Sequence, residues 1–252
     1  MLKERLVAVL ILRDACVVQS EQFRHTNLIH RDPSVAIEFF DRWAADEIVV
    51  LDVSRDKANR QKFLASVEAL AKRCFVPLTV GGWITSLDDI HDLLRRGADK
   101  VILNTQAVDT PGIIEACAKA YGSQCTVISI DCRKNEDGLQ TVYVDRGRRN
   151  TNRDPREWAL EAQRLGAGEI FLTSIDHEGM REGYDLKLVE KVSLALDIPV
   201  IAFGGASKWE HLVEGINQGR AHAVALANAL HYTEDSLRLA KQHMRSQGID
   251  VR

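Results

Sequence analysis

One carboxylate in this chain is well placed to transfer protons. Asp131 ends the apolar, β-branched run 126–131, a pattern typical of a buried parallel strand. An acid at the carboxyl end of such a strand occupies the position where α/β barrels carry catalytic groups. We therefore predict that Asp131 is a general base or acid, with a structural bond to Arg133 or to a loop N–H as the alternative.

The first strand-like run, 5–12, has no such acid. When Arg13 is aligned with Arg133, Ile11 falls at the position of Asp131. An isoleucine can neither donate nor accept a proton, so a pair of carboxylates on these two strands is not available. One half of the chain keeps an ionisable group where the other half has an alkyl group.

Two glycine turns predict anion binding. Gly81-Gly82 and Gly204-Gly205 each follow a strand-like run, and a polar turn follows the next strand in each half. Backbone N–H groups at such turns can approach a phosphate closely. Tight turns alone are the alternative, and Trp83 either narrows the first cradle or packs under a loop. The predicted phosphate-binding residues are Gly82, Asn104, Thr105, Glu178, Gly179, Gly204, Gly205, Ala227 and Asn228.

Four charged residues begin four of the predicted strands. They are Arg5, Glu47, Lys100 and Glu169. Strand starts meet at the floor of a barrel, so two cations and two anions there can form a neutral ring. Floor residues usually serve stability, and buried charges persist when they are paired. A structural ion ring is therefore the simplest interpretation from the residues alone.

Strand-like and helix-like runs alternate along the whole chain. The expected strands are 5–12, 47–52, 77–80, 100–104, 126–131, 169–174, 199–203 and 222–226. Strict alternation predicts a parallel sheet, and eight units predict a closed (βα)8 TIM barrel. Segments 45–52 and 167–174 resemble each other, as do 76–82 and 198–205, which indicates two repeated half-barrels. We expect one barrel domain over residues 1–252, with lids at the mouth formed by linkers 14–32 and 133–152, the second containing a hairpin.

Composition excludes several classes of function. The formal net charge of −3 gives no reason to expect nucleic acid or an anionic membrane as a partner. No apolar run is long enough to span a bilayer, and the first residues lack a signal-peptide core. Five cysteines without a CxxC pair fit a reducing cytoplasm, and the eight histidines show no metal spacing. We expect a cytoplasmic protein with no metal and no cofactor.

The whole chain resembles the cyclase subunit of imidazole glycerol phosphate synthase from histidine biosynthesis. The matching motifs are 79–82, 96–101, Asn104-Thr105, 122–124, 166–170, 172–176 and 204–206. The resemblance implies a (βα)8 barrel with two phosphate sites and a glutaminase docked on its floor. It also implies that ammonia passes a charged gate, which Arg5, Glu47, Lys100 and Glu169 match one by one, and then rises through the barrel.

Departures from that family alter the expected chemistry. The family's cyclase uses two aspartates; Asp131 matches one, and Ile11 stands in place of the other. Loss of one general acid or base costs about 10²–10⁴-fold in rate. Gln19 stands where the family has a lysine in the first loop, and Trp83 stands where it has the third glycine of a Gly-Gly-Gly turn. Glu178 is the acid of the second phosphate loop. The related isomerase also needs an acid on the first strand, so that activity is not expected either.

A divergent branch of the family resembles this chain more specifically, with an apolar end to strand one and the segment 129–134 at strand five. Such proteins are associated with bacterial surface polysaccharides such as O-antigen. There, a glutaminase, this barrel and an ATP-dependent sugar amidotransferase convert an acetamido sugar to an acetamidino sugar. The resemblance implies that the barrel delivers ammonia, with the glutaminase on its amino-terminal face and a phosphorylated small molecule at its mouth.

Two alternatives remain open. In the first, the chain is a working cyclase in which Asp14 or another mouth residue replaces the lost acid. In the second, the chain is a non-catalytic scaffold that activates the glutaminase without conducting ammonia.

Overall fold

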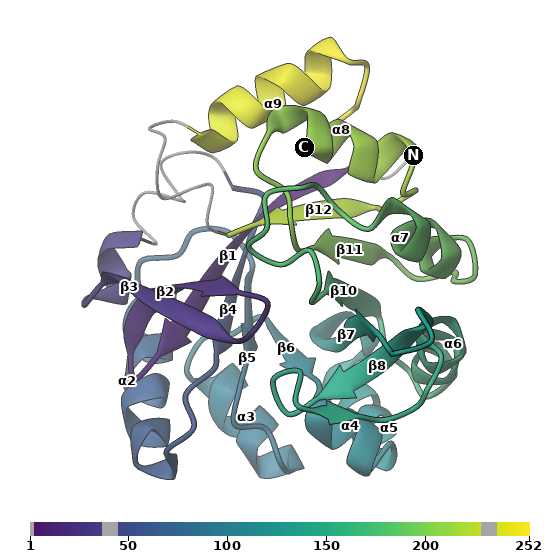
Figure 1. The fold of residues 1–252 in the computed structure, drawn as a ribbon. Coiled ribbons are helices and arrows are strands. Elements are labelled where there is room, and N and C mark those ends of the chain that lie inside the picture. The colour runs from purple at the N-terminus through teal and green to yellow at the C-terminus, as the bar shows by residue number, and fades with distance from the viewer. Residues whose placement is uncertain (1–2, 37–44, 228–235) are drawn as a thin grey trace.

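Eight parallel strands close into a barrel in the computed structural model, which describes residues 3–36, 45–227 and 236–252 (Figure 1). The strands are β1 (Arg5–Arg13), β4 (Glu47–Asp52), β5 (Leu78–Gly81), β6 (Lys100–Leu103), β7 (Thr126–Lys134), β10 (Glu169–Ser174), β11 (Val200–Phe203) and β12 (Ala223–Leu226). They pair in this order, and β12 pairs with β1 to complete the ring. The predicted (βα)8 class is confirmed.

Helices surround the barrel. They are α2 (Arg60–Ala71), α3 (Leu87–Arg95), α4 (Thr105–Asp109), α5 (Gly112–Tyr121), α6 (Pro155–Arg164), α7 (Leu186–Ser193), α8 (Trp209–Asn217) and α9 (Ser236–Ser246), with short 3-10 turns at Lys57–Asn59 and Ser123–Cys125. Their starts follow ordinary capping chemistry. Ser86 and Asp89 form a reciprocal capping box on α3, and Asp154 caps α6 ahead of Pro155.

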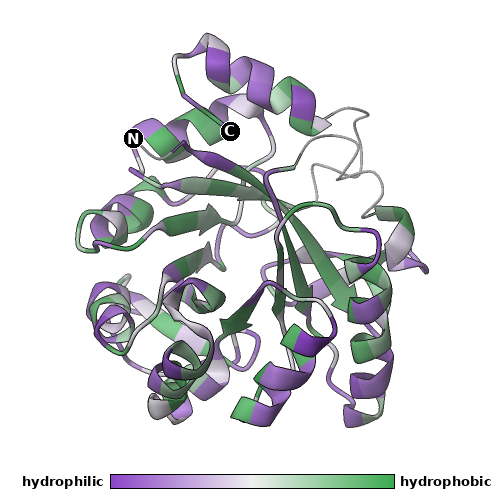
Figure 2. Cartoon of the chain, turned by 180° about the vertical axis from the view of Figure 1, so that it is seen from behind, coloured by the Kyte–Doolittle hydropathy of each residue, from purple (hydrophilic) through white to green (hydrophobic). Residues whose placement is uncertain are grey.

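Apolar side chains form two separate layers, because successive residues of a strand point to opposite faces. One layer packs the outside of the barrel against the helices, and it includes Leu6, Leu10, Val50, Phe63 and Trp158. The other fills the barrel interior, and it includes Val7, Val9, Val49, Ile102, Val127, Phe171, Ile201, Ala223 and Ala225. Figure 2 shows hydrophobic strands at the centre and hydrophilic residues on the outward faces of the helices.

Both long linkers contain strands. The first forms the hairpin β2 (Cys16–Glu21) and β3 (His25–His30), which extends from the end of β1. In the second, β8 (Gln140–Val144) folds back on β7 and pairs with β9 (Arg149–Asn150). Both hairpins follow barrel strands, so they lie on the mouth side where the sequence predicted lids.

The repeat is visible in how the two glycine turns pack. Gly82 and Gly204 both have positive φ values, of 126° and 101°. A Cβ atom on Gly82 would lie 2.9 Å from Cβ of Asp52, and one on Gly204 would lie 2.7 Å from the carbonyl oxygen of Ser174. These turns require glycine because each presses on the end of the preceding barrel strand.

Candidate functional site

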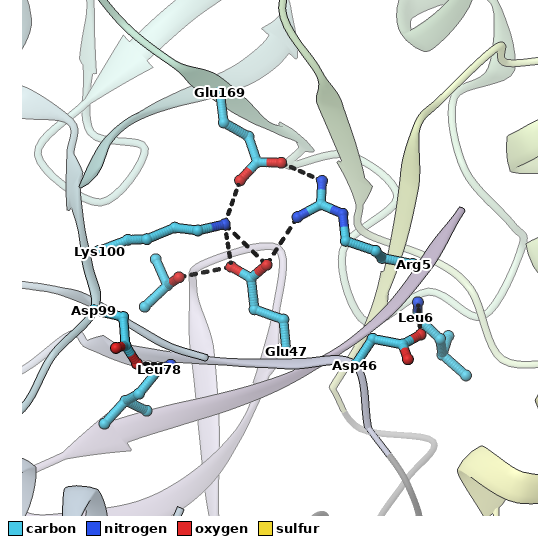
Figure 3. Close-up of polar contacts among 9 residues, drawn as sticks. Arg5, Leu6, Asp46, Glu47, Leu78, Asp99, Lys100 and Glu169 are labelled. Carbon is cyan, nitrogen blue, oxygen red and sulfur yellow. Dashed lines mark hydrogen bonds and ion pairs between the residues drawn. The ribbon is translucent and has the colours of Figure 1, made fainter. Parts of the chain in front are cut away.

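A ring of four charges lies at the amino ends of the strands (Figure 3). Arg5 Nη1 donates to Glu47 Oε2 over 2.8 Å, and Arg5 Nη2 donates to Glu169 Oε1. Lys100 Nζ lies 3.0 Å from Glu47 Oε2 and 2.9 Å from Glu169 Oε2. Each cation therefore bridges both acids, and we call Arg5, Glu47, Lys100 and Glu169 the charge ring.

The charge ring is largely withdrawn from solvent. The exposed fractions of the side chains are 2% for Glu47, 7% for Glu169, 14% for Arg5 and 19% for Lys100. Thr79 Oγ1 also donates to Glu47 Oε1 over 2.6 Å. Burial lowers the pKa of Arg5, but the carboxylates of Glu169 and Glu47 outweigh it and raise that pKa overall. The Arg5 guanidinium is thus held in its charged form.

Two further acids anchor the strands around this ring. Asp46 Oδ2 accepts from the backbone N–H of Leu6 over 2.8 Å, and Asp99 Oδ2 accepts from that of Leu78 over 2.8 Å (Figure 3). Asp46 is also paired with the buried ammonium of Lys241 on α9. These bonds tie the starts of neighbouring strands together, so the ring side chains have a rigid support.

At the opposite, mouth end, the barrel holds a cavity of about 320 Å³. Its lining includes Ile11, Leu51, Ile102 and Phe203 as apolar walls, and Asn104, Thr105, Ser129 and Asp131 as polar groups. The apolar interior layer lies between this cavity and the charge ring.

Asp131 is the buried acid of the cavity, with an exposed fraction of 7%. Its Oδ1 accepts from Ser129 Oγ over 3.0 Å, and its Oδ2 accepts from Asn104 Nδ2 over 3.1 Å. Burial raises the pKa of the Asp131 carboxyl from 3.8 to about 6, against hydrogen bonds from Ser129 and Thr173, which lower it. A carboxyl with this pKa can both accept and release a proton near neutral pH.

The position of the lost acid is occupied by a buried alkyl group, since Ile11 lines the same cavity and is 4% exposed. Asp14 does not take its place: its Oδ1 accepts from Asn59 Nδ2 over 2.7 Å, and it is not among the residues that line the cavity. Two other carboxylates, Asp52 and Asp145, do line it. Asp145 is paired with Arg146 over 3.3 Å.

The predicted phosphate residues fall into two groups. Gly82, Asn104 and Thr105 all line the cavity, and Thr105 Oγ1 accepts from the backbone N–H of Asp145 over 3.0 Å. Gly204, Gly205, Ala227, Glu178 and Gly179 do not line it. Asn228 lies outside the described residues.

The loop after β10 contacts the β2–β3 hairpin. Glu178 Oε2 accepts from Ser20 Oγ over 3.1 Å and from the backbone N–H of Phe23 over 3.2 Å. Gly179 is pressed against the hairpin as well, because a Cβ there would lie 2.7 Å from the carbonyl oxygen of Ser20. Burial raises the pKa of Glu178 from 4.5 to about 7, against these hydrogen bonds. In this structure Glu178 and Gly179 therefore hold the hairpin down over the mouth.

Sequence reasoning missed several cavity residues. Arg13, Arg24, Arg55 and Arg146 also line the cavity, as do Trp83 and Asp52. They come from the end of β1, the hairpin turn, the loop after β4 and the loop after β8. All four lie in or beside segments that follow barrel strands, which is the one feature of the sequence that could have placed them at the mouth. No spacing between them in the sequence predicts that they line the same cavity.

Fold and site together define a (βα)8 barrel with a ligand-sized cavity at the carboxyl ends of its strands and a charge ring at their amino ends. Residues 5–236 match the family described as "Histidine biosynthesis protein", and the chain belongs to that family. The match confirms the relationship to the histidine-biosynthesis cyclase barrels that the motifs predicted.

Two further features are absent from the part of the chain that the structure describes. No helix there is both long and apolar enough to cross a bilayer. No group of three or more His, Cys, Asp or Glu side chains is arranged there to hold a metal ion.

Proposed function

We propose that this chain is the barrel subunit of a glutamine-dependent amidotransferase complex. It receives ammonia from a glutaminase at its amino-terminal face and conducts it to the mouth for acetamidino-sugar formation in surface-polysaccharide synthesis. The observation that carries the proposal is the combination of a complete charge ring at the floor with an alkyl group, Ile11, in place of one catalytic acid.

The charge ring supports a gate. Its four side chains meet across the barrel axis, and both cations are shared between both acids. Lys100 is attached by flexible methylenes and is the most exposed member of the ring, so it is the member best able to swing aside. Ammonium would be held at the two acids, whereas neutral ammonia can pass.

The interior layer supports transit of a neutral molecule. The side chains of the interior layer are aliphatic or aromatic, and those that β12 contributes are the small Ala223 and Ala225. An apolar surrounding disfavours the charged form of an amine, so ammonia would stay unprotonated and nucleophilic there. The path leads to Asp131, which is hydrogen-bonded by Asn104 at the mouth.

Exposed apolar side chains near the floor support docking of a partner. Phe75, in the loop between α2 and β5, is 83% exposed, and Leu194, at the end of α7, is 70% exposed. Both loops lead into the amino ends of barrel strands. Large exposed apolar groups are typical anchors of protein interfaces. A glutaminase is the partner that we expect, because the charge ring would admit the ammonia that it releases.

The proposal is tested by isotope competition in the reconstituted complex of this chain, its glutaminase and the sugar amidotransferase. The reaction contains ATP, a nucleotide-linked acetamido sugar, glutamine labelled with ¹⁵N in its amide and an excess of unlabelled ammonium. Conducted nitrogen will keep its label in the acetamidino product, whereas nitrogen from bulk solution will be unlabelled. An unlabelled product would contradict the proposal.

Variants separate the proposal from its alternatives. Lys100→Met in the ring should reduce label retention, whereas Lys62→Met on the exposed face of α2 should not. Unchanged retention in the ring variant would favour a scaffold that activates the glutaminase without conducting ammonia. A parallel assay with the histidine-pathway ribonucleotide tests the cyclase alternative, and turnover near family rates would reject our proposal.

A further inference from the structure

The turn of the β2–β3 hairpin is held by two other elements at the mouth. In the loop after β10, the carbonyl oxygens of Glu178 and Asp176 accept from the backbone N–H and from Nε2 of Gln22, over 2.9 and 3.1 Å. On β7, Arg133 Nη2 donates to the carbonyl oxygen of Gln22 over 3.2 Å. Arg133 Nη1 donates to the carbonyl oxygen of Gly147 over 3.1 Å, so the same side chain also joins the hairpin to the β8–β9 turn.

The backbone of this turn depends on those contacts. Gln22 and Phe23 have φ values of 50° and 58°, in the left-handed region that side chains rarely adopt and that persists where the surrounding structure holds it. Phe23 is also a wall residue of the mouth cavity. Release of the turn would therefore remove part of the wall and open the cavity.

One carboxyl lies buried beneath the hairpin. Glu178 is 1% exposed, and its Oε2 accepts from Ser20 Oγ and from the backbone N–H of Phe23. Among the residues that the structure describes, no cation forms an ion pair with it, and the charged side chain that acts on it from the hairpin is another acid, Glu21. The nearest cation along the hairpin, Arg24, lines the cavity. A buried carboxylate without a cation is costly, so the neutral form is favoured here.

The other titratable groups of this loop and of β7 have partners of their own. Asp176 Oδ1 lies 3.7 Å from Nε of Arg133, and His177 Nδ1 lies 2.9 Å from Ser174 Oγ. Burial raises the pKa of Glu178 from 4.5 to about 7, and Glu21 adds to the rise, against the hydrogen bonds from Phe23 and Ser20. A Glu178 carboxyl released into water would return to its ordinary pKa. The latched state therefore holds the proton more tightly, and a rising pH favours release.

We propose that Glu178 is a pH-sensitive latch, which holds the β2–β3 hairpin over the mouth while its carboxyl carries a proton and loosens it when the carboxyl ionises. A protonated carboxyl can donate to Ser20 Oγ and still accept from the backbone N–H of Phe23. The ionised form places a second negative charge beside Glu21 in a buried position. Arg133 cannot be deprotonated in this range, so its bond to the turn is a second contact that does not depend on pH.

The inference does not require that ammonia is conducted. If the proposed function also holds, the latch sets how open the exit of the barrel is at a given pH.

Hydrogen exchange of the full chain measures the latch directly, because the amides of Gln22 and Phe23 donate to Glu178. Exchange is followed by mass spectrometry on peptides that contain these two residues, and rates are corrected for the pH dependence of intrinsic exchange. The shift from a pKa of about 7 to one of 4.5 predicts that their protection falls about tenfold between about pH 6 and about pH 8.5. Peptides from β4, in the barrel wall, are the internal reference and should keep their protection.

Glu178→Gln is the decisive variant, because glutamine has the shape of a protonated glutamate and cannot ionise. Its hairpin should stay protected at both pH values. Glu182→Gln, an exposed residue of the same loop, is the matched control and should behave as the parent chain does. Asp131→Asn, which removes another buried acid of the mouth, should also keep the tenfold change. Arg133→Gln should lower protection at both pH values and leave the ratio between them unchanged, as expected for a contact that does not titrate.

Three outcomes would overturn the inference. One is a parent chain whose hairpin protection is constant, or rises, between the two pH values. Another is a Glu178→Gln chain that keeps the tenfold change, which would assign the effect to a different group. The third is an equal loss of protection in the β4 peptides, which would indicate unfolding of the barrel. None of these bears on label retention through the charge ring, so failure here and failure of the proposed function are distinguishable.

Discussion

Ile11 and Asp131 stand on strands four places apart in the ring of eight, β1 and β7, and both line the mouth cavity. An alkyl group and a carboxyl with a pKa of about 6 therefore face one space from opposite walls. At these two strand positions there is one proton-transfer group where the two-carboxylate chemistry of the family needs a pair.

Ile11→Asp should restore that pair. If the rest of the cavity still accepts the histidine-pathway ribonucleotide, cyclase turnover should rise by about 10²–10⁴-fold, the usual worth of one general acid or base. Turnover is measured with ammonium as the nitrogen source, so that no glutaminase is needed. Ile11→Asn, which is of similar shape to aspartate but cannot transfer the proton, is the control and should stay inactive. An equal gain in both variants would contradict the explanation.

Stability should depend on pH through Asp131. Its folded pKa of about 6 lies above its ordinary value of 3.8, so the folded state holds the proton more tightly than the unfolded state. Its contribution is fully favourable below about pH 4 and is lost as the pH rises through 6, at a cost of about 3 kcal/mol. Asp131→Asn should therefore gain stability relative to the parent chain above pH 6, measured by urea unfolding across pH. A stability difference that does not change between pH 4 and 8 would refute this.

The charge ring should show strong energetic coupling. Lys100→Met leaves two buried carboxylates with one cation, and it should lower the free energy of unfolding by about 3 kcal/mol. Adding Glu169→Gln removes the excess negative charge and should recover part of that loss. A double-mutant cycle by urea denaturation measures the coupling. Strictly additive effects would show that Lys100 and Glu169 do not interact as the structure describes.

Phe75→Asp should weaken glutaminase docking. A side chain that is 83% exposed contributes little to folding, so the variant should unfold at the same temperature as the parent chain. Loss of an apolar interface anchor typically costs about 2 kcal/mol, which corresponds to roughly a thirtyfold rise in Kd. Surface plasmon resonance against the glutaminase gives the Kd. Leu139→Asp, in the exposed loop between β7 and β8 on the mouth side, is the control and should bind normally.

Local pattern in the sequence determined the barrel and the ends at which its chemistry lies. The starts and ends of the strands can be predicted because the apolar runs stop at charged residues. The half-barrel repeat predicts the same boundaries a second time, because equivalent strands in the two halves have similar sequences. For this reason Arg5, Glu47, Lys100 and Glu169 were assigned to one floor, and Asp131 to the mouth. Strand order in a closed ring then places them together without any knowledge of their side-chain conformations.

Only the tertiary structure decided which side chains from the loops line the same cavity. Glu178 resembles a phosphate-loop acid in the sequence, yet its carboxylate bonds Ser20 and the backbone of Phe23 from a different loop. Arg24, Arg55 and Trp83 meet at one cavity because the hairpin and two loops fold over it. Contacts between loops that are distant in the sequence leave no periodic pattern from which they could be predicted. The raised pKa of Asp131 likewise arises from burial, which only the closed fold creates.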